Sequence, residues 1–228
     1  MNQNNVSAED FVKKQLKRWE RRKLEGVKTG LAVLPIITFS GQPGSNGSIV
    51  AEQVAKRLEF DLFNRDIMKE IAQSVHMSTA FIDSLEKERL SGIEDFLASI
   101  VRDKYLHPDT YLVHLIKVVN TIAKHGRAVI VGRGANYILP ADSIFSVRVI
   151  APIEVRIKNV TNLFGTSQDE AKRRVVRRES KRKAFIRQAY NADIEDPLNY
   201  DMTINTAKIS IESAVDAVVG AIIGQQEG

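Results

Sequence analysis

The chain has no cysteine, and this absence excludes several kinds of site. Without thiols there is no disulfide, no thiolate nucleophile and no zinc site built on sulfur ligands. The sequence also has no apolar run close to the ~20 residues that a helix needs to cross a bilayer. Its first residues, MNQNNVSAEDFVKK, lack the apolar core of a secretory signal. We therefore expect a cytoplasmic protein.

Composition and charge narrow the class further. With 228 residues, 43% of them hydrophobic, the chain is long enough for one large α/β domain, or for a core domain with an appended helical part. The net charge of +5 suits a polyanionic partner, either nucleotide phosphates or nucleic acid. Basic residues concentrate at 11–25, with seven Lys and Arg, and at 168–187, with nine against three acids.

Residues 36–58, IITFSGQPGSNGSIVAEQVAKRL, are the most informative part of the sequence. An apolar strand-like run leads into a loop of glycines and small residues, and the loop opens into an amphipathic helix. Glycines allow the backbone to curl so that several N–H groups converge, and the helix N-terminus adds partial positive charge. This order of elements predicts a phosphate-binding loop.

The loop departs from the Walker pattern G-x-x-x-x-G-K-[ST] at two positions. Gly41 and Ser48 fit its first and last places, but Asn46 stands at the second glycine and Gly47 at the lysine. Asn is the non-glycine residue that most readily adopts a left-handed conformation. A phosphate loop without lysine needs its positive charge from elsewhere in the chain. The alternative interpretation is a glycine-rich turn that binds nothing.

Strand-like and helical segments alternate along the chain. We predict strands near 35–40, 60–64, 128–131, 144–150 and 202–205. Because the strands are nearly continuously apolar, we predict an α/β fold with a parallel sheet covered by helices on both faces. Such sheets bind ligands beyond the carboxyl ends of their strands. The loop at 41–48 and Arg133 both lie at such ends.

Four segments carry a family resemblance. They are FSGQPGSNGS at 39–48, VIVGRGANYIL at 129–139, RRESKRKAFIR at 177–187 and DIEDPLNYDMTINT at 193–206. Together they resemble the cytidylate kinase-like family of nucleoside monophosphate kinases, in which a glycine commonly occupies the lysine place of the loop. The resemblance runs from about 35 to 223.

The resemblance implies a domain organisation. It predicts a P-loop kinase domain at 31–228, with a helical acceptor-binding region at about 65–125 and a basic lid at about 165–192. Residues 1–30 would form a basic helical extension and linker. The more ordinary role of that helix is packing through Trp19, and contact with a membrane surface is the less favoured interpretation.

The resemblance also implies roles for charged residues of the lid. Arg182 and Arg187 correspond to arginines that close over the transferring phosphoryl group, with Arg178 and Arg156 as weaker candidates. Glu179 corresponds to the acid that orients Arg182. The guanidinium group suits this task because its fork of donors matches phosphate and does not deprotonate. The alternative for the lid is a charged, solvated helix face, and Arg156 could equally be a solvated helix residue.

Donor and acceptor sites follow from the same resemblance. Backbone N–H groups of the loop would hold the donor phosphates of ATP, and the Ser48 hydroxyl would ligate Mg²⁺. The predicted donor-site residues are Gly41, Gly44, Ser45, Asn46, Gly47 and Ser48. Arg133 corresponds to an arginine that reaches the acceptor nucleotide, although its two flanking glycines also fit a tight turn. Arg156 and Asn64 are further candidates on the acceptor side.

Two departures from the family pattern leave the base of the acceptor nucleotide undetermined. Asn64 and Gly134 stand where cytidylate kinases carry an Asp. We predict a kinase that moves the γ-phosphoryl group of ATP to a small acceptor, first a nucleoside monophosphate such as CMP or dCMP, and that needs Mg²⁺. The runner-up is a nucleotide-binding regulatory protein with little or no transfer activity. Nucleic-acid binding by the basic helices ranks last, because no recognised motif accompanies them.

Overall fold

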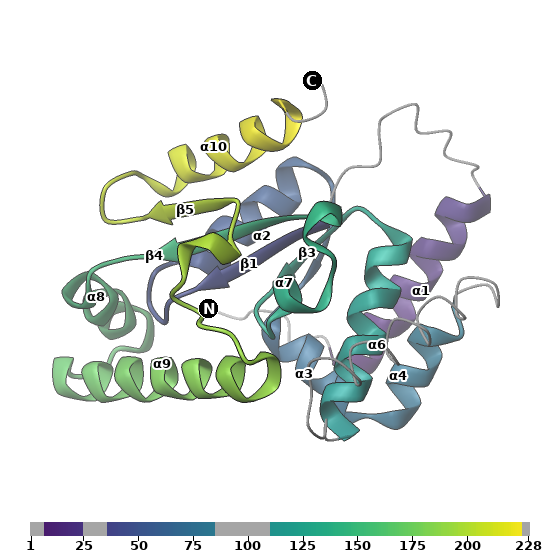
Figure 1. Ribbon diagram of the computed structural model, residues 1–228, viewed down its shortest axis with the longest axis horizontal. Coiled ribbons are helices and arrows are strands. Elements are labelled where there is room, and N and C mark those ends of the chain that lie inside the picture. Colours follow the sequence, from purple (N-terminus) through teal and green to yellow (C-terminus); the bar gives the residue numbers. More distant parts are fainter. Residues whose placement is uncertain (1–6, 25–35, 85–109, 225–228) are drawn as a thin grey trace. The chain divides into compact units, whose positions relative to one another are not determined.

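The computed structural model describes residues 7–24, 36–84 and 110–224, which fall into two compact units (Figure 1). The first unit consists of the helices α1 (Ala8–Leu24), α3 (Arg65–Gln73), α4 (Val75–Ile82) and α6 (Thr110–His125). The second unit contains the sheet and all remaining elements. Parts of the predicted extension and of the predicted acceptor-binding region, 25–30 and 85–109, lie outside the described residues.

Helix α1 packs within the first unit through its single tryptophan. Trp19 is buried, stacks on the His125 ring with centroids 3.7 Å apart and meets Phe81 edge-on at 5.0 Å. The packing role predicted for Trp19 is therefore confirmed. Helix α1 contacts α3 and α4. Both of these helices lie in the stretch, about 65–125, that was predicted to bind the acceptor.

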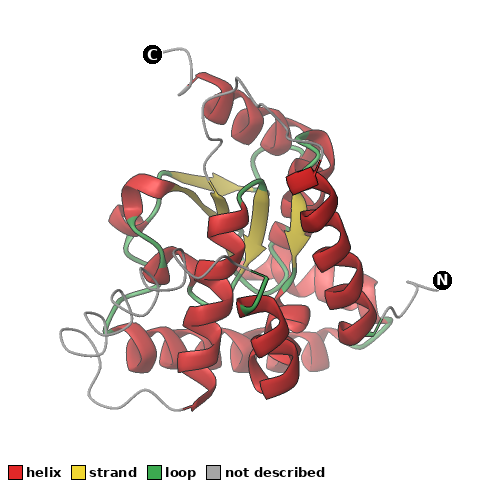
Figure 2. Ribbon diagram, turned by 90° about the vertical axis from the view of Figure 1, so that its right-hand side faces the viewer, coloured by secondary structure: helices red, strands yellow, loops and turns green. Residues whose placement is uncertain are grey.

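Five parallel strands form the sheet of the second unit, in the order β2-β3-β1-β4-β5 (Figure 2). Their bounds are β1 Ile36–Gly41, β2 Asp61–Phe63, β3 Ala128–Val131, β4 Ile144–Ile150 and β5 Met202–Asn205. All five predicted strands are confirmed. Short apolar runs that alternate with helices are buried on both faces when they pair as a parallel sheet. The helices of this unit flank the sheet, and they are α2 Gly47–Arg57, α7 Ala135–Ile138, α8 Ile153–Phe164, α9 Gln168–Tyr190 and α10 Ile211–Gly224. Single 3₁₀ turns occur at Ala141–Ser143 and Pro197–Asn199.

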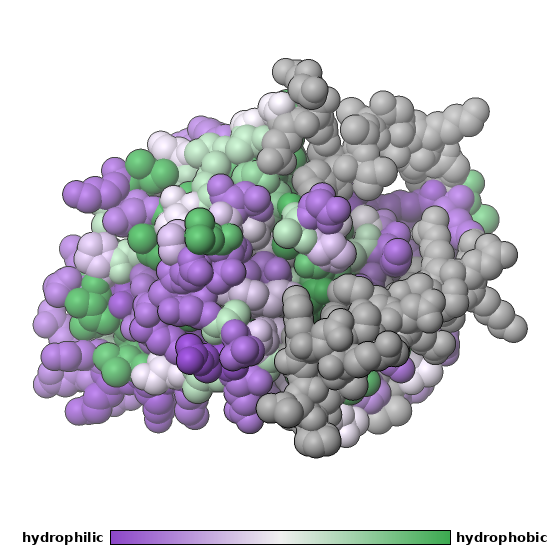
Figure 3. Space-filling model, viewed as in Figure 1, coloured by the Kyte–Doolittle hydropathy of each residue, from purple (hydrophilic) through white to green (hydrophobic). Residues whose placement is uncertain are grey.

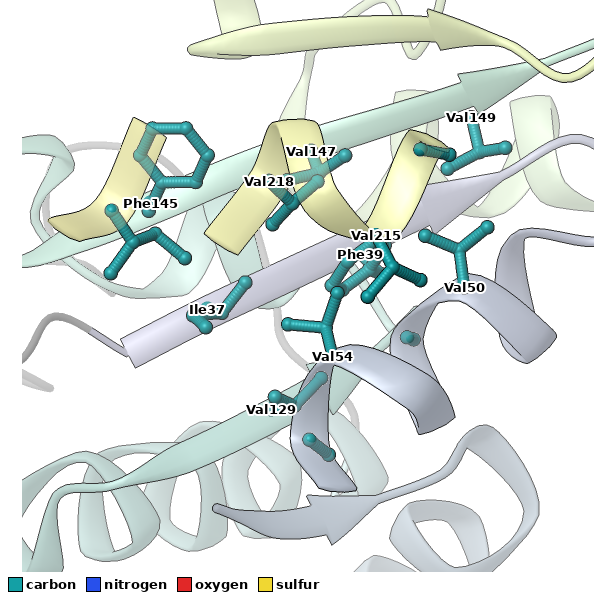
Figure 4. Close-up of a cluster of buried hydrophobic side chains, with 14 of the residues drawn as sticks. Ile37, Phe39, Val50, Val54, Val129, Phe145, Val147, Val149, Val215 and Val218 are labelled. Atoms are coloured by element: carbon teal, nitrogen blue, oxygen red, sulfur yellow. The ribbon is translucent and has the colours of Figure 1, made fainter. Parts of the chain in front are cut away.

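The main core lies between one face of the sheet and the helices α2 and α10. Figure 4 shows alternate residues of β1 and β4, such as Phe39 and Val147, directed toward Val54 of α2 and Val218 of α10. Side chains of the opposite parity, among them Arg148, lie on the other face of the sheet. Strand alternation therefore separates an apolar face from a face that carries polar groups at the ends of β1 and β4. No helix in the described ranges is long and apolar enough to cross a membrane.

Two neighbouring isoleucines on α10 test this core. Ile222 is fully buried in it, whereas Ile223 is 46% exposed. Ile222→Ala is expected to lower the free energy of unfolding by about 2–5 kcal/mol, because it removes buried methyl groups and leaves a cavity. Ile223→Ala is expected to change it by no more than ~0.5 kcal/mol. Urea denaturation of both variants measures the difference, and equal effects would contradict the packing of α10.

Candidate functional site

The loop at 41–48, here called the phosphate loop, turns sharply between β1 and α2. Gly44 has a φ of 83° and Asn46 a φ of 59° with a ψ of 13°. Asn46 thus adopts the left-handed conformation that the Walker glycine would adopt. At Gly44 a Cβ atom would lie 2.4 Å from the carbonyl oxygen of Arg156, so only glycine fits there.

Four amide N–H groups of the phosphate loop remain available. Within the described residues no acceptor is recorded for the N–H of Gly44, Asn46, Gly47 or Ser48. The Gln42 and Ser45 amides are used locally, on the carbonyls of Val149 and Gln42 at 2.9 and 3.1 Å. Free amides in successive left-handed and helical residues, at the start of a helix, form a cradle for an anion such as phosphate.

Side chains from outside the loop hold its carbonyl groups. Asn159 Nδ2 donates to the Gly44 carbonyl at 2.9 Å. Thr206 Oγ1 donates to the Ser45 carbonyl at 2.9 Å. The guanidinium of Arg182 donates to the Gly41 carbonyl. These bonds fix the loop from α8, from the segment after β5 and from α9, and none of them uses an amide of the cradle.

Gly47, which stands at the lysine position of the Walker pattern, is closely packed against its neighbours. A Cβ atom at Gly47 would lie 3.0 Å from Val149 Cβ and 3.2 Å from Gly41 Cα. Any larger residue therefore needs the loop or β4 to shift. The cations of this site must come from other elements.

Arg156 of α8 is not a solvated helix residue. Its side chain is 7% exposed, and its two terminal nitrogens donate to the two carboxylate oxygens of Glu179 at 3.1 and 3.3 Å. Its Nε donates to the Ala151 carbonyl at 3.0 Å. A bidentate pair of this kind has fixed geometry, so it joins α8 to α9 beside the phosphate loop.

Among the predicted lid arginines, the structure brings Arg182 to the loop. It lines a small pocket whose walls come from the loop, β4, α9 and the segment after α9. This loop–α9 pocket is lined by Gly41, Gln42, Pro43, Arg148, Glu179, Arg182, Lys183 and Ile194. Arg178 lies 6.0 Å from the Phe164 ring, and Arg187 is exposed and does not line the pocket. Figure 3 shows hydrophilic residues dominating the surface at the lower left, where α9 runs in Figure 1.

The segment after β3 has an unusual backbone. Gly132, Arg133 and Gly134 have successive φ values of 77°, 58° and 68°, and Arg133 is the strained member because it carries a Cβ. The Tyr190 hydroxyl donates to the Arg133 carbonyl at 2.7 Å. A Cβ atom at Gly134 would lie 2.2 Å from the Tyr190 ring. Asn64 follows β2, the strand next to β3, and is exposed.

Sequence reasoning missed Arg148 and the tyrosines near it. Arg148 is 6% exposed, donates to Ser40 Oγ at 2.7 Å and lies over the Tyr200 ring at 5.7 Å. The hydroxyls of Tyr200 and Tyr137 are 3.3 Å apart. Burial and then the Tyr200 hydrogen bond raise the pKa of Tyr137 above its ordinary value. The signal in the sequence was one arginine inside the apolar run IFSVRVI.

The parallel sheet with its phosphate loop defines a P-loop kinase fold. Residues 36–208 match the model of the cytidylate kinase-like family. The chain therefore belongs to the cytidylate kinase-like family and is a nucleoside monophosphate kinase-like phosphotransferase.

Similar proteins agree with this assignment. A cytidylate kinase of Methanocaldococcus jannaschii is 25% identical over 191 residues, covering 82% of this chain and 97% of that one. A cytidylate kinase of Pyrococcus abyssi is 29% identical over 189 residues, covering 82% and 93%. The crystal structure of an uncharacterised protein from Eubacterium ventriosum has a TM-score of 0.63 at 19% identity, covering 82% of this chain and 98% of that one. That likeness shows the fold alone.

Gly44 provides a test of the cradle. Gly44→Ala drives a methyl group into the Arg156 carbonyl and is expected to lower the affinity for ADP at least about tenfold, because the amides lose their alignment. Gly165→Ala is the matched control, since Gly165 has a φ of 60° but open space around its Cβ position. The control should lose ~1–2 kcal/mol of stability and keep its affinity. Calorimetric titration with ADP measures the affinity of each variant, and thermal melts measure its stability. Equal affinities for the two variants would contradict the cradle.

Proposed function

We propose that this chain transfers the γ-phosphoryl group of ATP to a nucleoside monophosphate, with CMP and dCMP as the first candidates. The cradle of four free amides between β1 and α2 carries the proposal. Membership of the cytidylate kinase-like family and relatives named cytidylate kinase support the choice of acceptor. In the reaction, an oxygen of the acceptor phosphate bonds to the γ-phosphorus. The bond from that phosphorus to the β–γ bridging oxygen breaks, which gives ADP and a nucleoside diphosphate.

The phosphate loop binds and orients the donor. Its N–H groups would donate to oxygens of the β-phosphate, and the side chains on its carbonyls keep the loop in this shape before ATP arrives. Preorganised donors of this kind stabilise charge without the cost of rearranging during the reaction. Ser48 is exposed at the start of α2, and its hydroxyl would ligate the metal ion.

A Mg²⁺ ion would neutralise phosphate charge and link the donor phosphates to the protein. No cluster of three or more His, Cys, Asp or Glu that could hold a metal is found in residues 7–24, 36–84 and 110–224. The ion would therefore be held by Ser48 and by phosphate oxygens, as in other phosphate-loop enzymes.

Arg182 is the lid arginine for which the geometry gives most support. It comes from α9, reaches the Gly41 carbonyl and lines the loop–α9 pocket. Its guanidinium would exchange the carbonyl for the transferring phosphoryl group. Glu179 and Arg156 act as positioning residues, because their ion pair fixes α9 against α8. On the acceptor side, Arg133 and Asn64 follow the neighbouring strands β3 and β2, where an acceptor could reach the end of the donor.

Direct detection of product tests the function. The purified chain is incubated with ATP and Mg²⁺ and, separately, with CMP, dCMP, UMP, AMP or GMP, and the nucleotides are separated by chromatography. We expect CDP or dCDP together with ADP in equal amounts. ATP binding without any diphosphate product would refute transfer to these acceptors and favour the regulatory nucleotide-binding protein, for which the glycine in the lysine place is the motivating observation.

Arg182→Ala tests the lid. Loss of an arginine that stabilises the transferring group is expected to lower kcat by about 10³-fold, because such arginines act mainly in the transition state. Arg57→Gln is the control: Arg57 is an exposed residue of α2 that pairs with Asp216 on α10. Steady-state rates and thermal melts of both variants are compared. An unchanged kcat in Arg182→Ala would refute the role of Arg182.

A further inference from the structure

Arg148 is a buried cation for which no carboxylate partner is found in residues 7–24, 36–84 and 110–224. It sits within β4 and is 6% exposed. Among the described residues its contacts are the Ser40 hydroxyl at 2.7 Å, the Ser40 carbonyl at 3.5 Å and the face of the Tyr200 ring. Buried arginines are ordinarily paired with an acid, because an isolated buried charge is costly. A guanidinium has five N–H donors, and these contacts use a minority of them.

The surroundings of Arg148 are suited to an anion. Arg148 and Arg182 line the loop–α9 pocket together with the first residues of the phosphate loop. Among the described residues of its lining the one acid is Glu179, and both oxygens of that carboxylate accept from Arg156. Lys183, the third basic residue of the lining, pairs with Glu195 at 2.6 Å. Among the described residues of the lining, Arg148 therefore has no carboxylate paired with it.

We propose that Arg148 binds a phosphate group and supplies, from the sheet, the positive charge that the phosphate loop lacks at Gly47. The inference rests on the proposed function, since it assumes that nucleotide phosphates occupy the end of the loop. Its ligand is a phosphate beside Gly41 and Arg182. That group is either the γ-phosphate of the donor or the phosphate of the acceptor, which present the same oxygens to a guanidinium.

Ser40 and Tyr200 hold Arg148 in place for this task. Ser40 Oγ accepts from Arg148 and lies 3.4 Å from the Tyr200 hydroxyl, which itself donates to the Ile194 carbonyl at 2.9 Å. The guanidinium is thus fixed between a strand end and an aromatic ring before any ligand binds. A side chain that is already ordered loses little conformational entropy on binding.

The experiment compares Arg148→Met, Arg148→Lys and wild type, with Arg57→Gln as a surface control. Calorimetric titrations use ADP, a non-hydrolysable ATP analogue and CMP, and thermal melts are recorded without ligand. Arg148→Met keeps the volume of the side chain and removes the charge. We expect at least one of the ATP analogue and CMP to bind about 10–100-fold more weakly to it, the usual effect of losing a charged hydrogen bond. ADP, which lacks the γ-phosphate, should lose less than the ligand that Arg148 binds.

The free protein gives the second readout. Removing an unpaired buried charge should leave the Tm of Arg148→Met unchanged or raise it, whereas loss of a purely structural arginine would lower it. Arg148→Lys should recover part of the lost affinity because it keeps the charge. Weakening confined to the ATP analogue assigns the donor γ-phosphate, and weakening confined to CMP assigns the acceptor phosphate.

Two results would overturn the inference. The first is unchanged affinity of Arg148→Met for all three ligands. The second is a lower Tm in both Arg148 variants with an equal loss for every ligand, which is the behaviour of a structural residue. If wild type itself binds none of the three ligands, the proposed function fails as well, and this outcome is distinct from the other two.

Discussion

The side-chain hydrogen bonds onto the carbonyls of the phosphate loop are the constraint on which the site depends. An isolated glycine-rich loop has many conformations, and its amides would converge only rarely. Here Asn159, Thr206 and Arg182 each hold one carbonyl of the loop. The three residues lie 115, 161 and 141 positions along the chain from the carbonyls that they hold, and the parallel sheet with its helical crossovers brings them to one end of β1. The fold therefore acts on function by fixing which backbone groups of the loop are already bonded and which are free.

The missing lysine is linked to the packing of the same loop. Gly47 lies close against Val149 of β4, so the loop approaches the sheet more closely than a side chain at this place would allow. The charge that a lysine would bring has to reach the phosphates from other elements. Arg182 comes from a helix and Arg148 from the adjacent strand, and both line one pocket. The two side chains differ in burial: Arg182 is half-buried on a helix, whereas Arg148 is buried within the sheet.

The sequence was sufficient for the features that depend on local rules. Short apolar runs between helices predicted all five strands, and glycines after the first strand predicted the phosphate loop. Asn46 was expected to accept a left-handed conformation, and it has one. Long-range pairing was beyond reach, because no local rule says which helix a charge will meet. The family resemblance linked Glu179 to Arg182, and in the fold both oxygens of Glu179 also accept from Arg156 on another helix. In the sequence, Arg148 is a single charged residue within an apolar strand. Its contact with Ser40 at the end of β1 depends on the register of the sheet, which the sequence does not show.

The departure at Gly134 also has a structural explanation. A side chain there would collide with the Tyr190 ring, so the aspartate that the family resemblance places at this position has no room. Tyr190 is buried, stacks on Tyr137 at 5.4 Å and donates to the Arg133 carbonyl. Aromatic rings thus occupy the space that a carboxylate would need. The end of β3 therefore presents aromatic rings and backbone groups at the position where the resemblance places a carboxylate, and Tyr190 fixes the backbone there by its bond to Arg133.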